Sequence, residues 1–391
     1  MPTQPLPAAI QESLTWLEDN LAQVIEETLH LCGIPAPTFD EAERAAYVAK
    51  RMQAIGLADV QSDSIHNVSG LLSNGQAHPT TLVVAHIDTV FSRPTPLDVR
   101  RTTKRLYGPS IGDNSVAVAA MLQVATAMRR LSVRPPGRVI FAASVGEEGL
   151  GNLCGIRALL AAWEGQIDTV IALEGHGVDE IRHAGIGSTR LEVTFHGPGG
   201  HSWGAFGTPS AIHVLGSAIH KITQLKVTQR PKTTYNVGLI SGGESVNTIA
   251  SRATMLVDLR SAHPRALQQL AAQVAHLLQE IGQQSGIQVR SRIVGQRPAA
   301  SLDTGHALCQ GMRAIRQQLR LRPATFTASS TDANLPLSLG IPALCLGITR
   351  GGLAHTVKEY IDIAPIPDGL KQLFLAILYT LQARDEVGTG H

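Results

Sequence analysis

The sequence predicts an α/β protein in which a mixed, mostly parallel sheet flanked by helices is interrupted by a smaller α+β unit. Short apolar runs alternate with segments of helical periodicity, the pattern of βαβ units. Near Gly185 this alternation gives way to half-exposed strands, and it returns after Arg297-Pro298. The domains expected from these changes are 1–185 plus 298–391, interrupted by 186–297.

The elements of the larger domain follow in order along the chain. It opens with two helices, of which the second ends near Gly56. Further along, a Gly-containing turn at 108–114 precedes an apolar helix in which Val118, Met121 and Ala125 recur at helical spacing. The remaining strands and helices are expected where apolar runs are bounded by turn residues. The helices are predicted at 8–32, 40–55, 153–163, 303–319 and 368–383, and the strands at 81–85, 138–143, 169–173, 324–328 and 342–346.

The inserted segment has the pattern of helices on an antiparallel sheet. Residues 190–195 and 253–259 alternate like strands with one solvated face. One helix is predicted over about 208–224, and a second begins with Pro264 in its first turn. The apolar face of the second helix is expected to consist of Leu267, Leu270, Val274, Leu277 and Ile281.

Composition excludes several classes of protein. The chain has 391 residues, and 33 basic against 31 acidic residues give a net charge of +2, which calls for neither nucleic acid nor a membrane as a partner. The longest nearly apolar run, Val116 to Met128, is too short to span a bilayer, and the N-terminus has no signal-peptide pattern. The 4 cysteines lie far apart, which argues against a disulfide framework or a thiolate zinc site. We therefore expect a soluble, cytoplasmic protein.

Ionisable residues gather where the predicted strands end. His86 and Asp88 follow one strand on the same side of the extended chain, so that the carboxylate can orient the imidazole. The adjacent carboxylates Glu147 and Glu148 follow another strand, where their mutual repulsion would not favour stability. The other three candidates are Asp113, in a loop opening a helix, Glu174, at a strand end, and His355, in a glycine-containing segment.

Taken singly, each of these residues has an ordinary structural explanation, such as a helix cap or a solvated turn. Together they all close or follow strands, which is where α/β folds place their sites. Imidazoles and carboxylates in this number are a ligand set suited to Zn²⁺ and related divalent ions.

These residues resemble the M20 family of di-zinc metallopeptidases, which also holds aminoacylases and N-acyl-amino-acid deacylases. The resemblance covers essentially the whole chain, including Gly199-Gly200-His201-Ser202 of the family's inserted dimerisation (lid) domain. It implies that 1–185 plus 298–391 form a catalytic metal-binding domain and that 186–297 is the dimerisation domain of a homodimer.

The resemblance also implies roles for the site residues. His86, Asp113 and Glu174 would hold one divalent metal ion, and Asp113, Glu148 and His355 the other, with Asp113 as the bridge. Asp88 would orient His86, and Glu147 would be the general base for a water activated by two metal ions. The ions implied are zinc, with manganese or cobalt as alternatives. The bond Asp113–Asn114 is expected to be cis, as the matching bond of the family usually is.

Three residues of the inserted domain match family positions that contact the substrate. His201 matches a residue that reaches across the dimer to stabilise the tetrahedral oxyanion. Asn247 and Arg260 match residues that bind substrate, often its carboxylate, for which the guanidinium fork is suited. The alternative for Arg260 is a surface salt bridge on its strand.

The predicted activity is hydrolysis of terminal amide bonds in short peptides, with an N-acyl-amino-acid deacylase as the alternative. Overall the chain looks like tripeptidase-type members, whereas Glu174 is typical of carboxypeptidases and deacylases, because family aminopeptidases tend to carry Asp there. Ser115 departs from the family pattern, since many members have Lys at that position. A third alternative is an inactive ligand-binding homologue, although that class should lack ligands or base, and here all are present.

Overall fold

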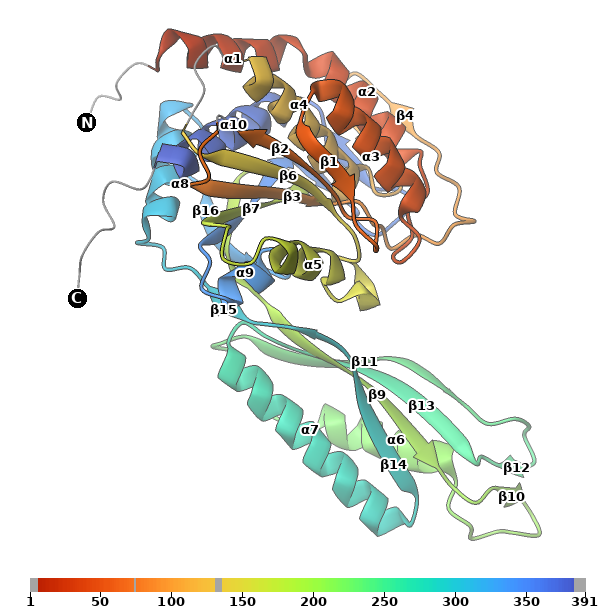
Figure 1. Cartoon of the computed structure of the whole chain (residues 1–391). Coiled ribbons are helices and arrows are strands. Elements are labelled where there is room, and N and C mark those ends of the chain that lie inside the picture. The colour runs from red at the N-terminus through yellow and green to blue at the C-terminus, as the bar shows by residue number, and fades with distance from the viewer. Residues whose placement is uncertain (1–5, 74, 131–135, 383–391) are drawn as a thin grey trace. The chain divides into compact units, whose positions relative to one another are not determined.

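The structure is a computed structural model that describes residues 6–73, 75–130 and 136–382. The chain divides into two compact units (Figure 1). One unit comprises the chain up to Ala184 and from Ser301 onward, and the other comprises Gly185–Ala300. The larger unit is α/β, as predicted.

A mixed sheet forms the centre of the larger unit. Its middle strands β6, β3, β7 and β17 run parallel, and antiparallel strands flank them on both sides. Such parallel strands are buried on both faces, and every residue of β3 is buried. The strand order is β1 (Ala58–Ser62), β2 (Val68–Ser73), β6 (Arg138–Ser144), β3 (Thr80–His86), β7 (Thr169–His176), β17 (Ala343–Thr349), β8 (Glu180–Gly185) and β15 (Ala300–Ser301), with β16 (Thr325–Ser329) paired to β8.

Helices cover both faces of this sheet (Figure 1). Helix α4 is buried on nearly all sides, because it packs on the sheet and is itself covered by other helices. No helix in the described ranges is long and apolar enough to cross a membrane. The helices of this unit are α1 (Ala8–Asp19), α2 (Leu21–Cys32), α3 (Ala42–Ile55), α4 (Val116–Arg130), α5 (Cys154–Ala162), α8 (Ala307–Gln318), α9 (Asn334–Ser338) and α10 (Ile366–Gln382).

One predicted helix is two helices in the structure. The segment 8–32 breaks at Asn20, whose side-chain amide donates to the carbonyl of Trp16 at 2.8 Å. Asparagine favours such local side-chain bonds over a continuous helix, so periodicity alone missed the break. Helix α3 ends at Gly56 in a left-handed conformation, as predicted. The last residue of the predicted helix 368–383 lies outside the described residues.

A second, small sheet joins two loops of the site. Its strands are β4 (Arg100–Arg101), β5 (Arg105–Tyr107), β18 (Gly351–Gly352) and β19 (Tyr360–Asp362). Strand β5 leads into a π-helical turn at Ile111–Ser115, whereas β18 and β19 bracket His355. Pairing of β19 with β5 therefore holds the Asp113 and His355 segments side by side.

The inserted unit has a four-stranded antiparallel sheet, β11 (Thr233–Gly242), β13 (Arg252–Ser261), β9 (Gly187–His196) and β14 (Gln288–Arg297). Helices α6 (Ala211–Thr223) and α7 (Pro264–Ser285) pack on it. Pro264 lies in the first turn of α7, as predicted, but Leu278 rather than Leu277 is the buried residue on its apolar face. A short ribbon of β10 (Gly200–His201) and β12 (Thr248–Ile249) lies at one end of the sheet (Figure 1).

Candidate active site

Three strands of the central sheet end at the same place and carry polar side chains there. His86, the last residue of β3, lies opposite Ser144 of β6, directly before the Val145–Glu148 loop. On the other side of β3, Ala85 pairs with Leu173 of β7, so that Glu174 follows beside His86. Because parallel strands end at a common edge, this register gathers residues that are far apart in sequence.

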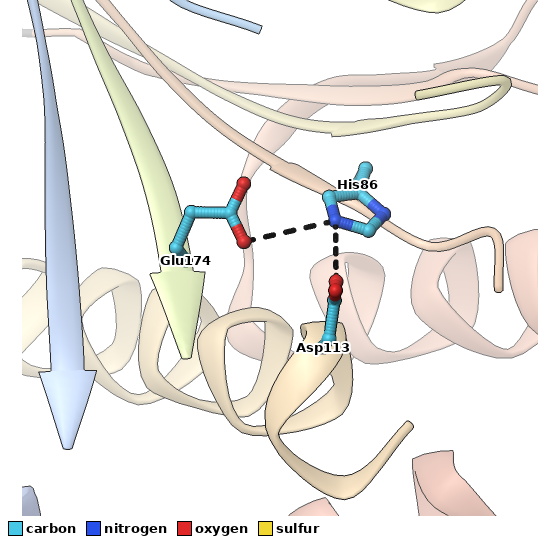
Figure 2. A group of neighbouring side chains, drawn as sticks. All are labelled: His86, Asp113 and Glu174. Atoms are coloured by element: carbon cyan, nitrogen blue, oxygen red, sulfur yellow. Dashed lines mark ion pairs between the residues drawn. The ribbon is translucent and has the colours of Figure 1, made fainter. Parts of the chain in front are cut away.

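His86 faces two carboxylates (Figure 2). Its Nε2 lies 3.1 Å from Oδ1 of Asp113 and 3.9 Å from Oε2 of Glu174. The other ring nitrogen, Nδ1, lies 3.2 Å from the backbone carbonyl of Asp88 and 3.4 Å from its carboxylate. Nδ1 is thus occupied by Asp88, and Nε2 points at the two carboxylates, the orientation that a metal-ligating histidine needs.

Asp113 is shared between two groups of side chains. Its Oδ2 lies 3.0 Å from Nε2 of His355, which in turn lies 3.2 Å from Oε1 of Glu148. The potential ligand atoms of His86, Asp113 and Glu174 lie within 4.8 Å of one another, and so do those of Asp113, Glu148 and His355. The structure therefore brings together both sets of residues that the sequence resemblance implied, with the same aspartate in each.

The loop of Asp113 is held against the end of β7. The bond Asp113–Asn114 is cis, as predicted. The buried side-chain amide of Asn114 donates to the carbonyl of Leu173 at 2.8 Å. The residue directly after Leu173 is Glu174, so this bond ties the loop of Asp113 to the segment that carries Glu174.

These residues fit divalent cations. Oδ1 of Asp113 is buried and has no hydrogen-bond partner among the described residues, although His86 lies beside it. Three carboxylates in one mostly buried cluster repel one another unless positive charge lies between them. Carboxylate and imidazole ligands suit zinc and its neighbours among the transition metals.

The charge of the cluster also appears in the pKa values. Burial raises the pKa of Glu174 to about 7, and the nearby charge of Asp113 adds to this. Hydrogen bonds to Asp113 and Glu148 raise the pKa of His355 to about 10. Burial of His86 opposes its protonation, but its contacts with Asp113 and Asp88 outweigh burial and raise the pKa. A metal ion would replace these protons, because imidazole binds metal only when neutral.

Asp88 connects the strand end to the Glu147 loop. The carboxylate is fully buried, and it accepts the backbone N–H groups of Glu147 at 2.9 Å and Glu148 at 2.8 Å. The hydroxyl of Thr38 donates to it at 2.9 Å. Glu147 is buried, and one of its carboxylate oxygens lies within 4.8 Å of ligand atoms of His86 and Glu148. The sequence predicted the contact of Asp88 with His86 but not its bonds to this loop.

Other supporting residues gave no clear sequence signal. Arg44 of α3 is buried and donates to the carbonyls of Ile34 and Ile87, the latter lying between His86 and Asp88 in sequence. Buried Glu41 accepts the N–H of Gly146 at 3.1 Å, next to Glu147. A charged residue in an otherwise amphipathic helix is usually solvated, so only the folded chain shows that these two are buried.

The segment Ser330–Asn334 supports the end of β6. Oδ2 of Asp332 accepts a hydrogen bond from the hydroxyl of Ser144 at 2.6 Å, and both residues are buried. The side chain of Asn334 accepts the N–H of Thr331 at 2.9 Å. Asp332 thus contacts the residue from which the Val145–Glu148 loop starts.

In the inserted unit, the structure brings His201 and Asn247 together. Strand β10 pairs with β12, placing His201 opposite Thr248, the neighbour of Asn247. Nδ1 of His201 accepts the backbone N–H of Trp203 at 3.2 Å, so Nε2 carries the proton of the neutral ring. His201 is exposed, so this proton is available to donate a hydrogen bond.

Arg260 lies elsewhere in the inserted unit. Its Nε donates to Asp258 at 2.6 Å, the strand salt bridge that the sequence left open. The β10–β12 ribbon adjoins the Arg252 end of β13, and eight residues at roughly 3.3 Å each put Arg260 about 26 Å along that strand. Within one chain, Arg260 and Asn247 therefore do not form a common clamp.

Comparison with known proteins decides the family. Residues 82–379, more than two thirds of the chain, match the model of peptidase family M20/M25/M40. The chain belongs to this family. It is accordingly a hydrolase of amide bonds, and the inactive ligand-binding alternative is set aside.

Relatives span almost the full length of the chain. An acetylornithine deacetylase from Myxococcus xanthus is 26% identical over 372 residues, covering 90% of this chain and 94% of that protein. A tripeptidase from Staphylococcus aureus superposes with a TM-score of 0.78 at 20% identity, over 93% of this chain and 99% of the other. A dinuclear metal-binding peptidase of the M20 family from Bacillus subtilis has a TM-score of 0.70 at 14% identity, over 94% and 100%. The chain is therefore similar in fold to peptidases and similar in sequence to a deacetylase.

Proposed function

We propose that this M20-family hydrolase is an exopeptidase that cleaves the terminal amide bond of short peptides with the aid of two divalent metal ions. The observation that carries the two-ion part of the proposal is the position of Asp113, whose two carboxylate oxygens face two separate groups of ligands. One ion would be held by His86, Asp113 and Glu174, and the other by Asp113, Glu148 and His355. Bound at such a site, a pair of ions lowers the pKa of a water and polarises the scissile carbonyl.

Glu147 is the proposed general base. Asp88 fixes the backbone of Glu147, and burial keeps its carboxylate away from bulk solvent. It would take a proton from the attacking water and deliver it to the leaving nitrogen. Its neighbour Glu148 is committed to the group that contains His355, so the two adjacent glutamates divide ligation and proton transfer between them.

An N-acyl-amino-acid deacylase is the second candidate. It is favoured by the acetylornithine deacetylase that matches nearly the whole chain and by Glu174 in place of aspartate. Both candidates hydrolyse an amide bond. They differ in the acyl side of that bond, which is an amino acid or peptide for an exopeptidase and a simple acyl group for a deacylase.

The inserted unit is the proposed dimerisation domain of a homodimer. Strand β11 is an edge strand of its sheet and exposes Leu239 and Ile240. An exposed apolar edge favours pairing with another strand, here that of a second copy. Within one chain, Arg260 lies at the opposite end of β13 from His201 and Asn247. A dimer would let His201 and Asn247 of one copy act together with Arg260 of the other.

Zinc is the proposed metal, with manganese and cobalt as alternatives, because carboxylate and imidazole ligands suit all three. We also propose a cytoplasmic location. All 4 cysteines are unpaired, as expected of a chain kept in a reducing compartment.

A substrate panel tests the proposal. Purified protein, freed of metal and then supplied with Zn²⁺, Mn²⁺ or Co²⁺, is assayed on dipeptides, tripeptides and their N-acetyl and C-amidated forms. The panel also includes N-acetyl amino acids. Turnover of free peptides above that of N-acetyl amino acids supports the exopeptidase, and the reverse order supports the deacylase. No hydrolysis of any member by the metal-loaded protein would refute both.

A further inference from the structure

A buried carboxylate outside the predicted ligand sets lies directly behind Asp113. Glu359 follows His355 by four residues, just before β19, and its side chain is completely buried. One of its oxygens, Oε1, accepts the backbone N–H of Asp113 at 2.8 Å and that of Gly112 at 3.2 Å. An uncompensated carboxylate would not be kept at this depth, so its purpose lies in what it binds.

His176 supplies a third contact to the same oxygen. It ends β7, two residues after Glu174, and its Nε2 lies 2.7 Å from Oε1 of Glu359. The ring passes between Gly112 and Gly351, and a side chain at either glycine would overlap it. These two glycines are therefore required for His176 to reach Glu359.

The segment from His355 to Glu359 consequently contacts both the side chain and the backbone of Asp113. His355 contacts its carboxylate at 3.0 Å, and Glu359 contacts its backbone N–H. His176, from the strand that carries Glu174, fixes Glu359 in turn. The backbone of the shared aspartate is thereby tied to the segments that carry a ligand of each proposed metal ion.

We propose that Glu359, oriented by His176, is a positioning residue that fixes the backbone of Asp113 so that its carboxylate can serve two metal ions at once. The inference rests on the proposed di-metal function. Glu359 acts as a hydrogen-bond acceptor of fixed reach, because three donors converge on one oxygen. A purely structural role would lower stability and leave metal binding unchanged.

Three variants distinguish the length of the side chain at position 359 from its charge. Glu359→Ala removes the acceptor. Glu359→Gln keeps an oxygen at the same distance without the charge, whereas Glu359→Asp keeps the charge but withdraws it by about 1.5 Å. The matched control is Asp168→Ala. The carboxylate of Asp168 contacts the imidazole of His78 and the backbone N–H of Thr80, at the end of β3 opposite the site.

Zinc stoichiometry and affinity are measured by competition with a chromophoric chelator, together with the melting temperature of the metal-free proteins and kcat and KM. We expect Glu359→Ala and Glu359→Asp to weaken zinc binding about 10- to 100-fold and to lower kcat more than they change KM. Glu359→Gln should stay within about threefold of the parent, since it retains the acceptor. Asp168→Ala should lower the melting temperature without weakening zinc binding.

Each other outcome overturns the inference. Parent-like zinc affinity and kcat in Glu359→Asp, or a Glu359→Gln variant whose zinc binding is weakened at least tenfold, would show that reach is not what matters. Equal loss of zinc affinity in Asp168→Ala would trace the effect to general stability. If Glu359→Ala does not fold, the Gln and Asp variants decide alone. A parent protein that binds no zinc pair would refute the proposed function itself, a separate result.

Discussion

Asp88 accepts the backbone N–H of Glu147 at 2.9 Å. This bond connects the end of β3 with the loop after β6, so the residue beside His86 also sets where the proposed base lies. The same carboxylate accepts the N–H of Glu148. A single buried aspartate thus positions a proposed ligand on one strand and both glutamates on the next.

Replacing Glu147 by Gln should abolish most turnover without removing metal. The substitution keeps the shape of the side chain but removes the base, so kcat should fall by roughly 10²- to 10⁴-fold. Metal analysis and rate assays on the purified variant test this, with exposed Glu164→Gln as the control. Retained activity, or loss of both metal ions, would contradict the role.

Asp88→Asn should impair the site although Asp88 belongs to neither proposed ligand set. The two carboxylate oxygens each accept one backbone N–H, and an amide keeps only one acceptor oxygen and no charge. Metal affinity or kcat should therefore fall about 10- to 100-fold. Asp63→Asn, which alters a similar backbone-accepting carboxylate in an exposed turn, should leave both parent-like. Equal effects of the two changes would argue against a specific role.

Removing the metal should destabilise the larger unit. Without cations, Asp113, Glu148 and Glu174 repel one another, and a ligand present at a hundred times its Kd contributes about 2.7 kcal/mol to the folded state. A chelator should therefore lower the melting temperature by at least about 5 °C, and added zinc should restore it. The double variant His86→Ala/His355→Ala should show no such response to zinc, which serves as the control.

His201 should act on the site of the other subunit. Neither His201→Ala nor His86→Ala should be active alone, but mixing them should recover up to about a quarter of parental activity, because half of the dimers would be hybrids with one intact site. Subunit exchange is first demonstrated by differential labelling. Exchange without recovery would place the action of His201 within its own chain.

The last prediction concerns the substrate carboxylate. If Arg260 binds it, C-terminal amidation should lower kcat/KM at least about tenfold in the parent and much less in Arg260→Ala. Arg260 is partly exposed and already paired with Asp258, so the loss should be smaller than for a buried ion pair. Arg292→Ala, an exposed strand arginine paired with Glu192, is the control. Harmless amidation combined with loss of activity on N-acetylation would indicate an aminopeptidase instead.

The sequence by itself determined the α/β class and the residues of the site. Those features follow from local patterns: apolar runs such as 81–85 favour buried strands, and ionisable residues directly after such strands are expected at a sheet edge. His86, Asp88, Glu147, Glu148 and Glu174 were found in this way, whereas Asp113 and His355 lie in loops. The roles of all seven came from the resemblance to the M20 family, and the structure brings the residues together.

Only the tertiary structure decided which polar residues support that site. Arg44, Glu41 and Glu359 are charged residues in segments that look solvated in sequence, and their burial depends on contacts between distant parts of the chain. The separation of Arg260 from Asn247 likewise follows from the register of β13 with its neighbours. Hydrogen bonds between residues far apart in sequence leave no periodicity, so folding alone reveals them.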